Sequence, residues 1–155
     1  MRYSIDTSAI LDGWRRHYPP EAFPALWDRI HDLIEAGDLI ATEEVLYELE
    51  KQDDDVYAWA LANRSIFYSI DPRTQVAVSQ ILRDHPRLVD TRKNRSGADP
   101  FVIALAKVQD CVVVTGEPPT NNPDRPNIPD VCRAMGVRCI SLLQLVLEQR
   151  WVFEV

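Results

Sequence analysis

Short apolar runs alternate along the chain with longer segments in which apolar residues recur every three or four positions. The runs 39–41 and 111–115 are typical of buried strands, whereas 23–34 has the spacing of an amphipathic helix. Alternation of this kind predicts an α/β protein with a central parallel sheet and right-handed crossovers. We expect four to five strands in a three-layer α/β/α arrangement.

The predicted strands are 3–6, 39–41, 65–70, 111–115 and 137–140. The predicted helices are 8–13, 20–36, a long one from 42 with a break or kink at 53–55, 71–85, one from 99, 130–135 and 141–149. Residues 117–129 hold five prolines, so we expect this segment to be ordered only where it packs. No repeat or linker interrupts the pattern, which predicts a single domain over residues 1–155.

Composition supports a compact protein that acts in the cytoplasm. The chain has 155 residues, of which 46% are hydrophobic, enough for one substantial core. No apolar run approaches the roughly 20 residues that cross a bilayer, and the N-terminus enters a strand directly, so neither a membrane span nor a signal peptide is expected. Three cysteines, an odd number, argue against a disulfide framework and favour a reducing compartment.

The net charge of −7 disfavours a general nucleic-acid binder, but the charge is unevenly distributed. A basic group formed by Arg92, Lys93 and Arg95 precedes Asp99, whereas acids crowd residues 43–55. A bound metal would also change the local sign of an acidic pocket. The charge therefore weakens a nucleic-acid function without removing it.

Four acids lie at predicted strand ends or on the helices near them: one ends the first strand, one lies on the helix after the second strand, one begins a helix, and one lies two residues past the strand 111–115. They are Asp6, Glu48, Asp99 and Glu117. Groups beyond the carboxyl ends of neighbouring parallel strands converge on one crevice, where close carboxylates repel one another by a few kcal/mol per pair. Such an arrangement favours recruitment of a divalent cation, and we expect a metal-dependent phosphodiesterase site, most simply a nuclease.

Each acid also has a structural explanation. Asp6 can cap the helix that follows it, and Asp99 before Pro100 is a good N-cap. Glu44 lies one helical turn from Glu48, and either can be a solvated surface residue. Asp130, a further candidate, favours the positive end of its own helix. The joint placement of the acids after strands of one sheet favours the functional interpretation.

Four segments carry a resemblance to PIN-domain nucleases, and they occur in the expected order. They are YSIDTS at 3–8, VLYEL at 45–49, GADPFVIALA at 97–106 and CVVVTGE at 111–117. They are similar to the family's strand ending in Asp, its helical Glu-Leu pair, its Asp-initiated helix and its strand ending in Thr-x-Asp. The segments 128–132 and 136–140 resemble an uncharacterised prokaryotic PIN-like branch. Glu117 departs from the family's usual Asp, and the proline-rich segment after it is long.

The resemblance implies a PIN-like fold and a Mg²⁺- or Mn²⁺-dependent endoribonuclease of the toxin type. It implies metal ligation by Asp6, Asp99 and Glu117, with Glu48 as the fourth catalytic acid that binds metal or orients water. Glu48 fits the Glu-Leu pattern better than Glu44. Hydroxyls that would hydrogen-bond these carboxylates belong to Thr7, Ser8 and Thr115, and Arg92, Lys93 and Arg95 would meet RNA phosphates.

The partners implied are an RNA substrate and a small DNA-binding antitoxin, with an Arg of the inhibitor pairing with the carboxylates. The RNA target and the oligomeric state, a homodimer included, stay open. A catalytically inert PIN-like binding or assembly module is the alternative, although retention of all four acids argues against it. A phospho-acceptor domain is disfavoured because Ser141, not Lys, follows the last strand.

Overall fold

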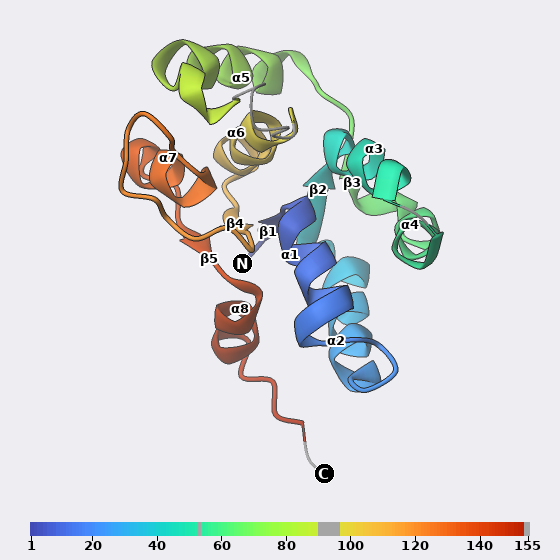
Figure 1. The fold of residues 1–155 in the computed structure, drawn as a ribbon. Helices are drawn as coiled ribbons and strands as arrows, with labels where there is room; N and C mark the ends of the chain where they lie inside the picture. Colours follow the sequence, from blue (N-terminus) through green and yellow to red (C-terminus); the bar gives the residue numbers. More distant parts are fainter. Residues whose placement is uncertain (53, 90–96, 154–155) are drawn as a thin grey trace.

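The computed structural model describes residues 1–52, 54–89 and 97–153, in which five parallel strands form one central sheet (Figure 1). The strands are β1 (Tyr3–Ile5), β2 (Leu39–Thr42), β3 (Phe67–Tyr68), β4 (Val112–Val114) and β5 (Cys139–Ile140). Their order across the sheet is β3-β2-β1-β4-β5, and Tyr3 lies opposite both Leu39 and Val112. The predicted parallel sheet is confirmed, with five strands.

Helices connect the strands. The α-helices are α1 (Thr7–Asp12), α2 (Pro24–Glu35), α3 (Glu43–Gln52), α4 (Asp54–Ala62), α5 (Pro72–Asp84), α6 (Asp99–Gln109), α7 (Ile128–Met135) and α8 (Leu142–Glu148). A π-helical turn, η1 (Gly13–His17), continues α1, and two 3₁₀ turns, η2 (Arg64–Ile66) and η3 (Pro86–Leu88), flank β3 and α5. None of the described helices is long and apolar enough to cross a membrane.

The chain winds in two directions from the centre of the sheet. From β1 it proceeds through β2 to β3, and it then returns to build β4 and β5 on the other side of β1. The helices α5, α6 and α7 gather on one side of the sheet, and α1, α2 and α8 lie on the other, which gives the predicted three layers (Figure 1). The direction of winding reverses between β1 and β4, and in open α/β sheets ligands bind in the crevice at such a point.

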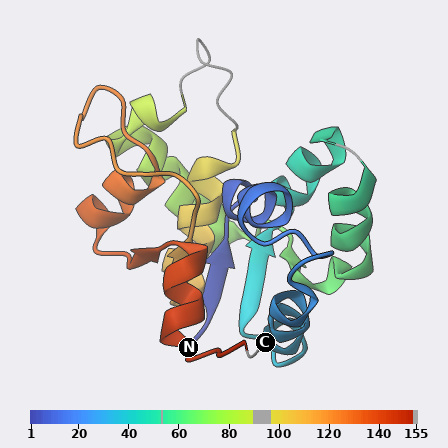
Figure 2. The same cartoon turned by 60° about the horizontal axis from the view of Figure 1, so that its bottom comes forward.

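The core surrounds β1 and α6. All of β1 is buried, and most of α6 is buried because this helix lies between the sheet and its neighbours α5 and α7. The buried Ser4 hydroxyl donates to the Val102 carbonyl at 3.0 Å, which ties the first turns of α6 to β1. Because α6 leads directly back into β4, its N-terminus lies at the carboxyl edge of the sheet. Figure 2 shows β1 and β2 running in the same direction, with α1 beyond their carboxyl ends.

Several element boundaries differ from those that the pattern predicts. The helix expected from residue 20 begins at Pro24, because a proline has no N–H to donate and suits the first helical position. The strand expected over 65–70 is reduced to Phe67–Tyr68, after a 3₁₀ turn. The helix expected to end near Gly13 continues as η1. The break expected near 53–55 falls at residue 53, between α3 and α4, and this residue lies outside the described part of the chain.

Candidate active site

Asp6 is a buried carboxylate at the point where β1 meets α1. It occupies the N-cap position of α1, yet its side chain makes no capping hydrogen bond, so the capping interpretation does not account for it. The hydroxyls of Ser8 and Thr115 donate to its Oδ2 at 2.5 and 2.9 Å. Burial raises the pKa of Asp6, and the Ser8 and Thr115 hydroxyls, together with the weaker influence of the Thr7 and Ser8 backbone N–H groups, offset only part of this effect. The carboxylate is therefore oriented but poorly neutralised.

Glu48 is the acid of α3 that faces Asp6. The Thr7 hydroxyl donates to Glu48 Oε1 at 2.6 Å, which links the start of α1 to α3. Burial raises the pKa of Glu48 to about 7, the Thr7 hydrogen bond acts against this shift, and the nearby charge of Asp6 adds to it. The pKa of Glu44 is also raised by burial, but its next influence is the charge of Glu43. The structure thus brings Glu48, rather than Glu44, to Asp6.

The two remaining acids also lie at the carboxyl edge of the sheet. Asp99 is buried and is the first residue of α6, so the N-cap predicted at this residue is at Ala98 instead. Glu117 follows β4, and its Oε1 accepts the Ile128 N–H at 3.2 Å at the start of α7. Its own N–H donates to Thr115 Oγ1 at 3.1 Å. Glu117 therefore holds the first residue of α7 as well as lying at the carboxyl edge of the sheet.

Gly116 allows the end of β4 to approach α1 closely. Its N–H donates to Ser8 Oγ at 2.9 Å, and this oxygen lies 3.2 Å from Thr115 Oγ1. A Cβ atom at Gly116 would lie 2.6 Å from Asp12 Oδ2 and 3.1 Å from the Ser8 carbonyl oxygen. A side chain there would displace the backbone that carries the Ser8 and Thr115 hydroxyls. The hydroxyls predicted to surround the acids, those of Thr7, Ser8 and Thr115, are brought together with Asp6 and Glu48.

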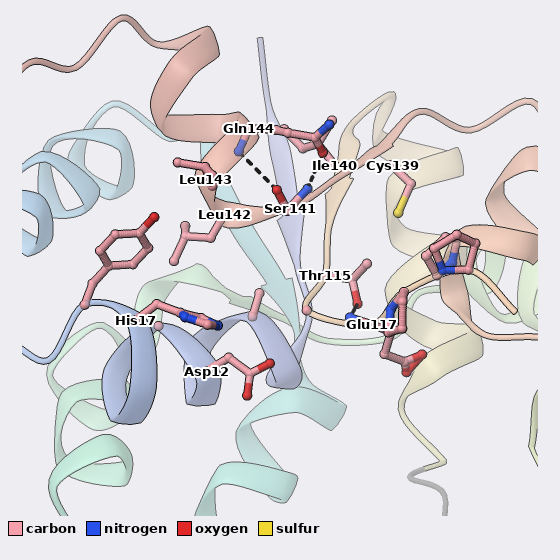
Figure 3. Close-up of a pocket in the computed structure, with 17 residues that line it drawn as sticks. Asp12, His17, Thr115, Glu117, Cys139, Ile140, Ser141, Leu142, Leu143 and Gln144 are labelled. Atoms are coloured by element: carbon pink, nitrogen blue, oxygen red, sulfur yellow. Dashed lines mark hydrogen bonds between the residues drawn. The ribbon is translucent and has the colours of Figure 1, made fainter.

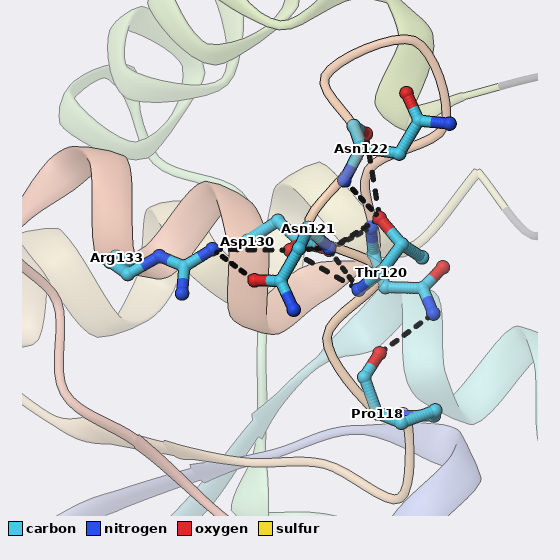
Figure 4. A network of polar contacts seen from close by, with 7 residues as sticks. Pro118, Thr120, Asn121, Asn122, Asp130 and Arg133 are labelled. Carbon is cyan, nitrogen blue, oxygen red and sulfur yellow. Dashed lines mark hydrogen bonds and ion pairs between the residues drawn. The ribbon is translucent and has the colours of Figure 1, made fainter.

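Asp130, a predicted additional site acid, is instead the centre of a polar network that orders the proline-rich segment (Figure 4). Its carboxylate accepts backbone N–H groups from Thr120, Asn121 and Asn127 at 2.9, 2.9 and 2.8 Å. Burial acts to raise the pKa of Asp130, but these N–H groups outweigh it and lower the pKa to about 2. The segment expected to be ordered only where it packs is thus held by one carboxylate.

The oxygen donors of this edge fit a hard divalent cation. Asp6 and Glu48 are carboxylates whose pKa values are raised, so a positive charge between them would offset their desolvation and repulsion. Within the described residues, no three side chains of Asp, Glu, His or Cys are placed to hold a metal ion together. Mg²⁺ is usually held by one or two carboxylates and several waters, and a pair of acids meets that requirement.

Two further groups of residues come from the sequence analysis, the basic group and the cysteines. Arg92, Lys93 and Arg95, the predicted RNA contacts, lie outside the described residues. The three cysteines are free, and burial contributes to the raised pKa of the Cys111 thiol. The three histidines are scattered along the sequence, which predicts surface positions for them, and His17 is exposed.

The structure places His17 with Asp12 in a cavity beside Thr115 and Glu117 (Figure 3). This position depends on the π-helical turn η1, for which the sequence carries no signal that we recognise.

Residues 3–153 match the family described as "Domain of unknown function (DUF4411)", and the chain belongs to this family. No match was found among curated proteins. Among solved structures, the chain is similar to one from the complex described as VapBC2 from Rickettsia felis bound to a DNA fragment from their promoter. The TM-score is 0.56 at 11% sequence identity, covering 91% of this chain and 98% of the other. At that identity the match shows a shared fold, and it confirms the predicted PIN-like fold class.

Proposed function

We propose that this protein is a Mg²⁺- or Mn²⁺-dependent endoribonuclease from a prokaryotic branch of the PIN-like proteins. The observation that carries the proposal is the state of Asp6. This buried carboxylate lies where the winding of the sheet reverses, makes no capping hydrogen bond, and faces a second acid, Glu48. Strongly perturbed carboxylates in a crevice of this kind are candidates for catalysis.

In this proposal Asp6 would hold the metal directly, Asp99 and Glu117 would hold it directly or through bound water, and Glu48 would bind it or orient the attacking water. A bound divalent cation would polarise the scissile phosphate and stabilise the charge that develops on it. Ser8 and Thr115 fix the direction of the Asp6 carboxylate through the hydrogen bonds to Oδ2. Thr7 holds Glu48, whose pKa of about 7 suits a group that accepts a proton near neutral pH.

We further propose that the protein is the toxin of a toxin–antitoxin pair that acts in the cytoplasm. The fold is shared with a chain of a complex described as VapBC2, which binds a DNA fragment from its promoter. Its partner would be a small DNA-binding antitoxin that places an Arg over Asp6 and Glu48, since a guanidinium pairs well with carboxylates. The free cysteines would stay reduced in that compartment.

The primary test is RNA cleavage by the purified chain with and without Mn²⁺. Asp6→Asn keeps the shape of the side chain and removes its charge, and we expect cleavage to fall at least about 100-fold, the usual scale for removal of a group that acts in the transition state. Asp28→Asn, an exposed acid of α2, is the matched control and should cleave like the wild type. Calorimetry should show Mn²⁺ binding that Asp6→Asn weakens strongly.

The inert binding or assembly module is the second candidate. It is favoured by the engagement of Glu117 with the start of α7, and by the absence of three clustered ligand side chains in the described part of the chain. Expression in cells separates the two candidates. Toxicity that requires Asp6 and disappears on co-expression of the genomic neighbour supports the toxin. Harmless expression, with no metal-dependent cleavage of any RNA, supports the inert module.

A further inference from the structure

A cavity of about 580 Å³ adjoins the acids, within the range of about 300–1,000 Å³ typical of small-ligand sites. Four segments line it: α1 with η1, the residues that follow β4, the start of α7, and β5 with the residues that follow it. In Figure 3, Asp12 and His17 lie on one side, and Leu142 and Leu143 face them from the start of α8. Thr115 and Glu117 lie at a third side, so the cavity is continuous with the candidate active site.

Two aromatic residues line this cavity at the end of the π-helical turn η1: His17, its last residue, and Tyr18, which follows it. Tyr18 is held from outside the cavity, because its ring packs edge-to-face on Phe23 with centroids 5.5 Å apart and its carbonyl accepts the Trp27 indole N–H at 2.7 Å. Trp14 of the same turn packs on Trp27 at 5.0 Å. The turn is therefore fixed before any ligand arrives, and π-helical turns are frequent at functional sites.

The cavity combines apolar walls with two carboxylates, of which Asp12 lies beside the rings at the end of η1 and Glu117 lies toward the acids of the candidate active site and accepts the Ile128 N–H. Leucine and proline side chains supply much of the apolar surface. A carboxylate accepts hydrogen bonds and donates none. Among the nucleobases, guanine alone offers two adjacent N–H donors on its Watson–Crick edge, and single-stranded RNA is read through that edge and through stacking on aromatic rings.

We propose that this cavity binds a guanine base of the RNA strand, with Asp12 accepting its N1–H and N2–H groups and Tyr18 or His17 stacking on its face. The proposal rests on the proposed ribonuclease function, which supplies the strand. Arg16 of η1 is exposed and lies next to His17, so it is placed to contact the phosphate of the same nucleotide. The guanine would then lie close to the scissile phosphate and set the sequence preference of cleavage.

Metal-free binding of single nucleotides tests the cavity without any need for catalysis. Guanosine 5′-monophosphate, titrated against labelled protein, should shift the NMR signals of Gly13, Gly116 and Leu143, all of which line the cavity. Inosine 5′-monophosphate, which lacks the 2-amino group, should bind about 10-fold more weakly, on the scale of one lost bidentate contact. Uridine and adenosine monophosphates should bind no better than the inosine nucleotide.

Two variants and one control complete the test. Asp12→Asn should weaken the binding of guanosine monophosphate about 10-fold or more and leave the binding of uridine monophosphate unchanged. The control Asp28→Asn should bind both nucleotides like the wild type. Leu143→Trp fills the cavity from an exposed position and should block every nucleotide in a folded protein. Equal binding of all nucleotides, or undiminished guanosine binding by Asp12→Asn, would overturn the assignment.

An arginine side chain offers a donor fork similar to that of guanine, so N-acetyl-arginine amide is titrated in parallel. Tighter binding of that probe than of guanosine monophosphate would overturn the proposal in favour of a protein ligand. Cleavage that depends on Asp6 but ignores a guanosine-to-inosine exchange in the RNA would refute the guanine site and leave the ribonuclease standing. Guanosine monophosphate binding without cleavage of any RNA would leave the guanine site standing and refute the ribonuclease.

Discussion

Asp6 and Asp130 both have carboxylates with little exposure to solvent, and both lie near a helix N-terminus. Their pKa values are nevertheless shifted in opposite directions. Asp130 receives three backbone N–H groups from the segment 120–127, and its pKa falls to about 2. Asp6 receives two hydroxyls, lies beside Glu48, and has a raised pKa because burial dominates. The fold satisfies the charge of Asp130, whereas Asp6 is the carboxylate that an ion would neutralise under the proposed function.

The largest expected effect is on the satisfied carboxylate. Asp130→Ala removes every acceptor of the network, and we expect the free energy of unfolding at pH 7 to fall by about 2–3 kcal/mol, the scale of hydrogen bonds to a charged group. Because the folded pKa lies below the unfolded value, this stability is present above pH 4 and is lost as the pH falls toward 2.

Urea denaturation at pH 7 and pH 2.5 measures the effect of Asp130→Ala. The deficit of the variant should be large at pH 7 and much smaller at pH 2.5. Asp124→Ala, an exposed acid of the same segment, is the matched control and should change little. A deficit that is the same at both pH values would mean that the charge of Asp130 contributes nothing.

The sequence predicts the frame of the fold because the apolar periodicity that buries the sheet is local. The runs 39–41 and 111–115 become β2 and β4, and the spacing over 23–34 becomes most of α2. Residues 65–70 do not form a full strand because η2 takes their first part, and among the described strands β3 pairs with β2 alone, at the edge of the sheet. An edge strand with one partner is specified less strongly by burial.

In the candidate site, too, the contacts that follow from the regular strands can be predicted from the sequence, and the others cannot. That Asp6 and Thr115 meet follows from their strand ends, since β1 and β4 are neighbours. The engagement of Asp130 by residues nine and ten positions earlier depends on the path of a proline-rich segment, which no periodicity encodes. The cavity beside η1 likewise depends on a π-helical turn. Contacts through irregular backbone are therefore what the sequence pattern leaves unspecified.

The second effect has the opposite sign and concerns the unsatisfied carboxylate. Without metal, Asp6→Asn should raise the free energy of unfolding at pH 8 on the order of 1–2 kcal/mol, as removal of functional strain commonly does. A raised folded pKa means that the wild type loses stability as the pH rises through that pKa, whereas Asn does not titrate.

Adding Mn²⁺ should reverse the order of Asp6→Asn and the wild type, because an ion that binds only the folded wild type stabilises it. Thermal unfolding at pH 8, with and without Mn²⁺, gives both comparisons. If Asp6→Asn is less stable than the wild type under both conditions, the Asp6 carboxylate has a structural role, like that of Asp130.

The smallest effect separates the two glutamates of α3. Glu48 has a folded pKa of about 7, above the ordinary value of 4.5, so the wild type should lose stability as the pH rises from 4.5 to about 7, and Glu48→Gln should remove that loss. Glu48 is only half-buried, so solvent screening keeps the expected difference below about 1 kcal/mol.

Glu44→Gln lies one helical turn away and is the matched control, because Asp6 does not contribute to the raised pKa of Glu44. Metal-free denaturation at several pH values measures the slope for each variant. The opposite result, in which Glu44→Gln flattens the dependence of the unfolding free energy on pH and Glu48→Gln leaves it unchanged, would show that Glu44 is the acid that faces Asp6. The contrast with Asp130 would then concern the pair of Asp6 and Glu44.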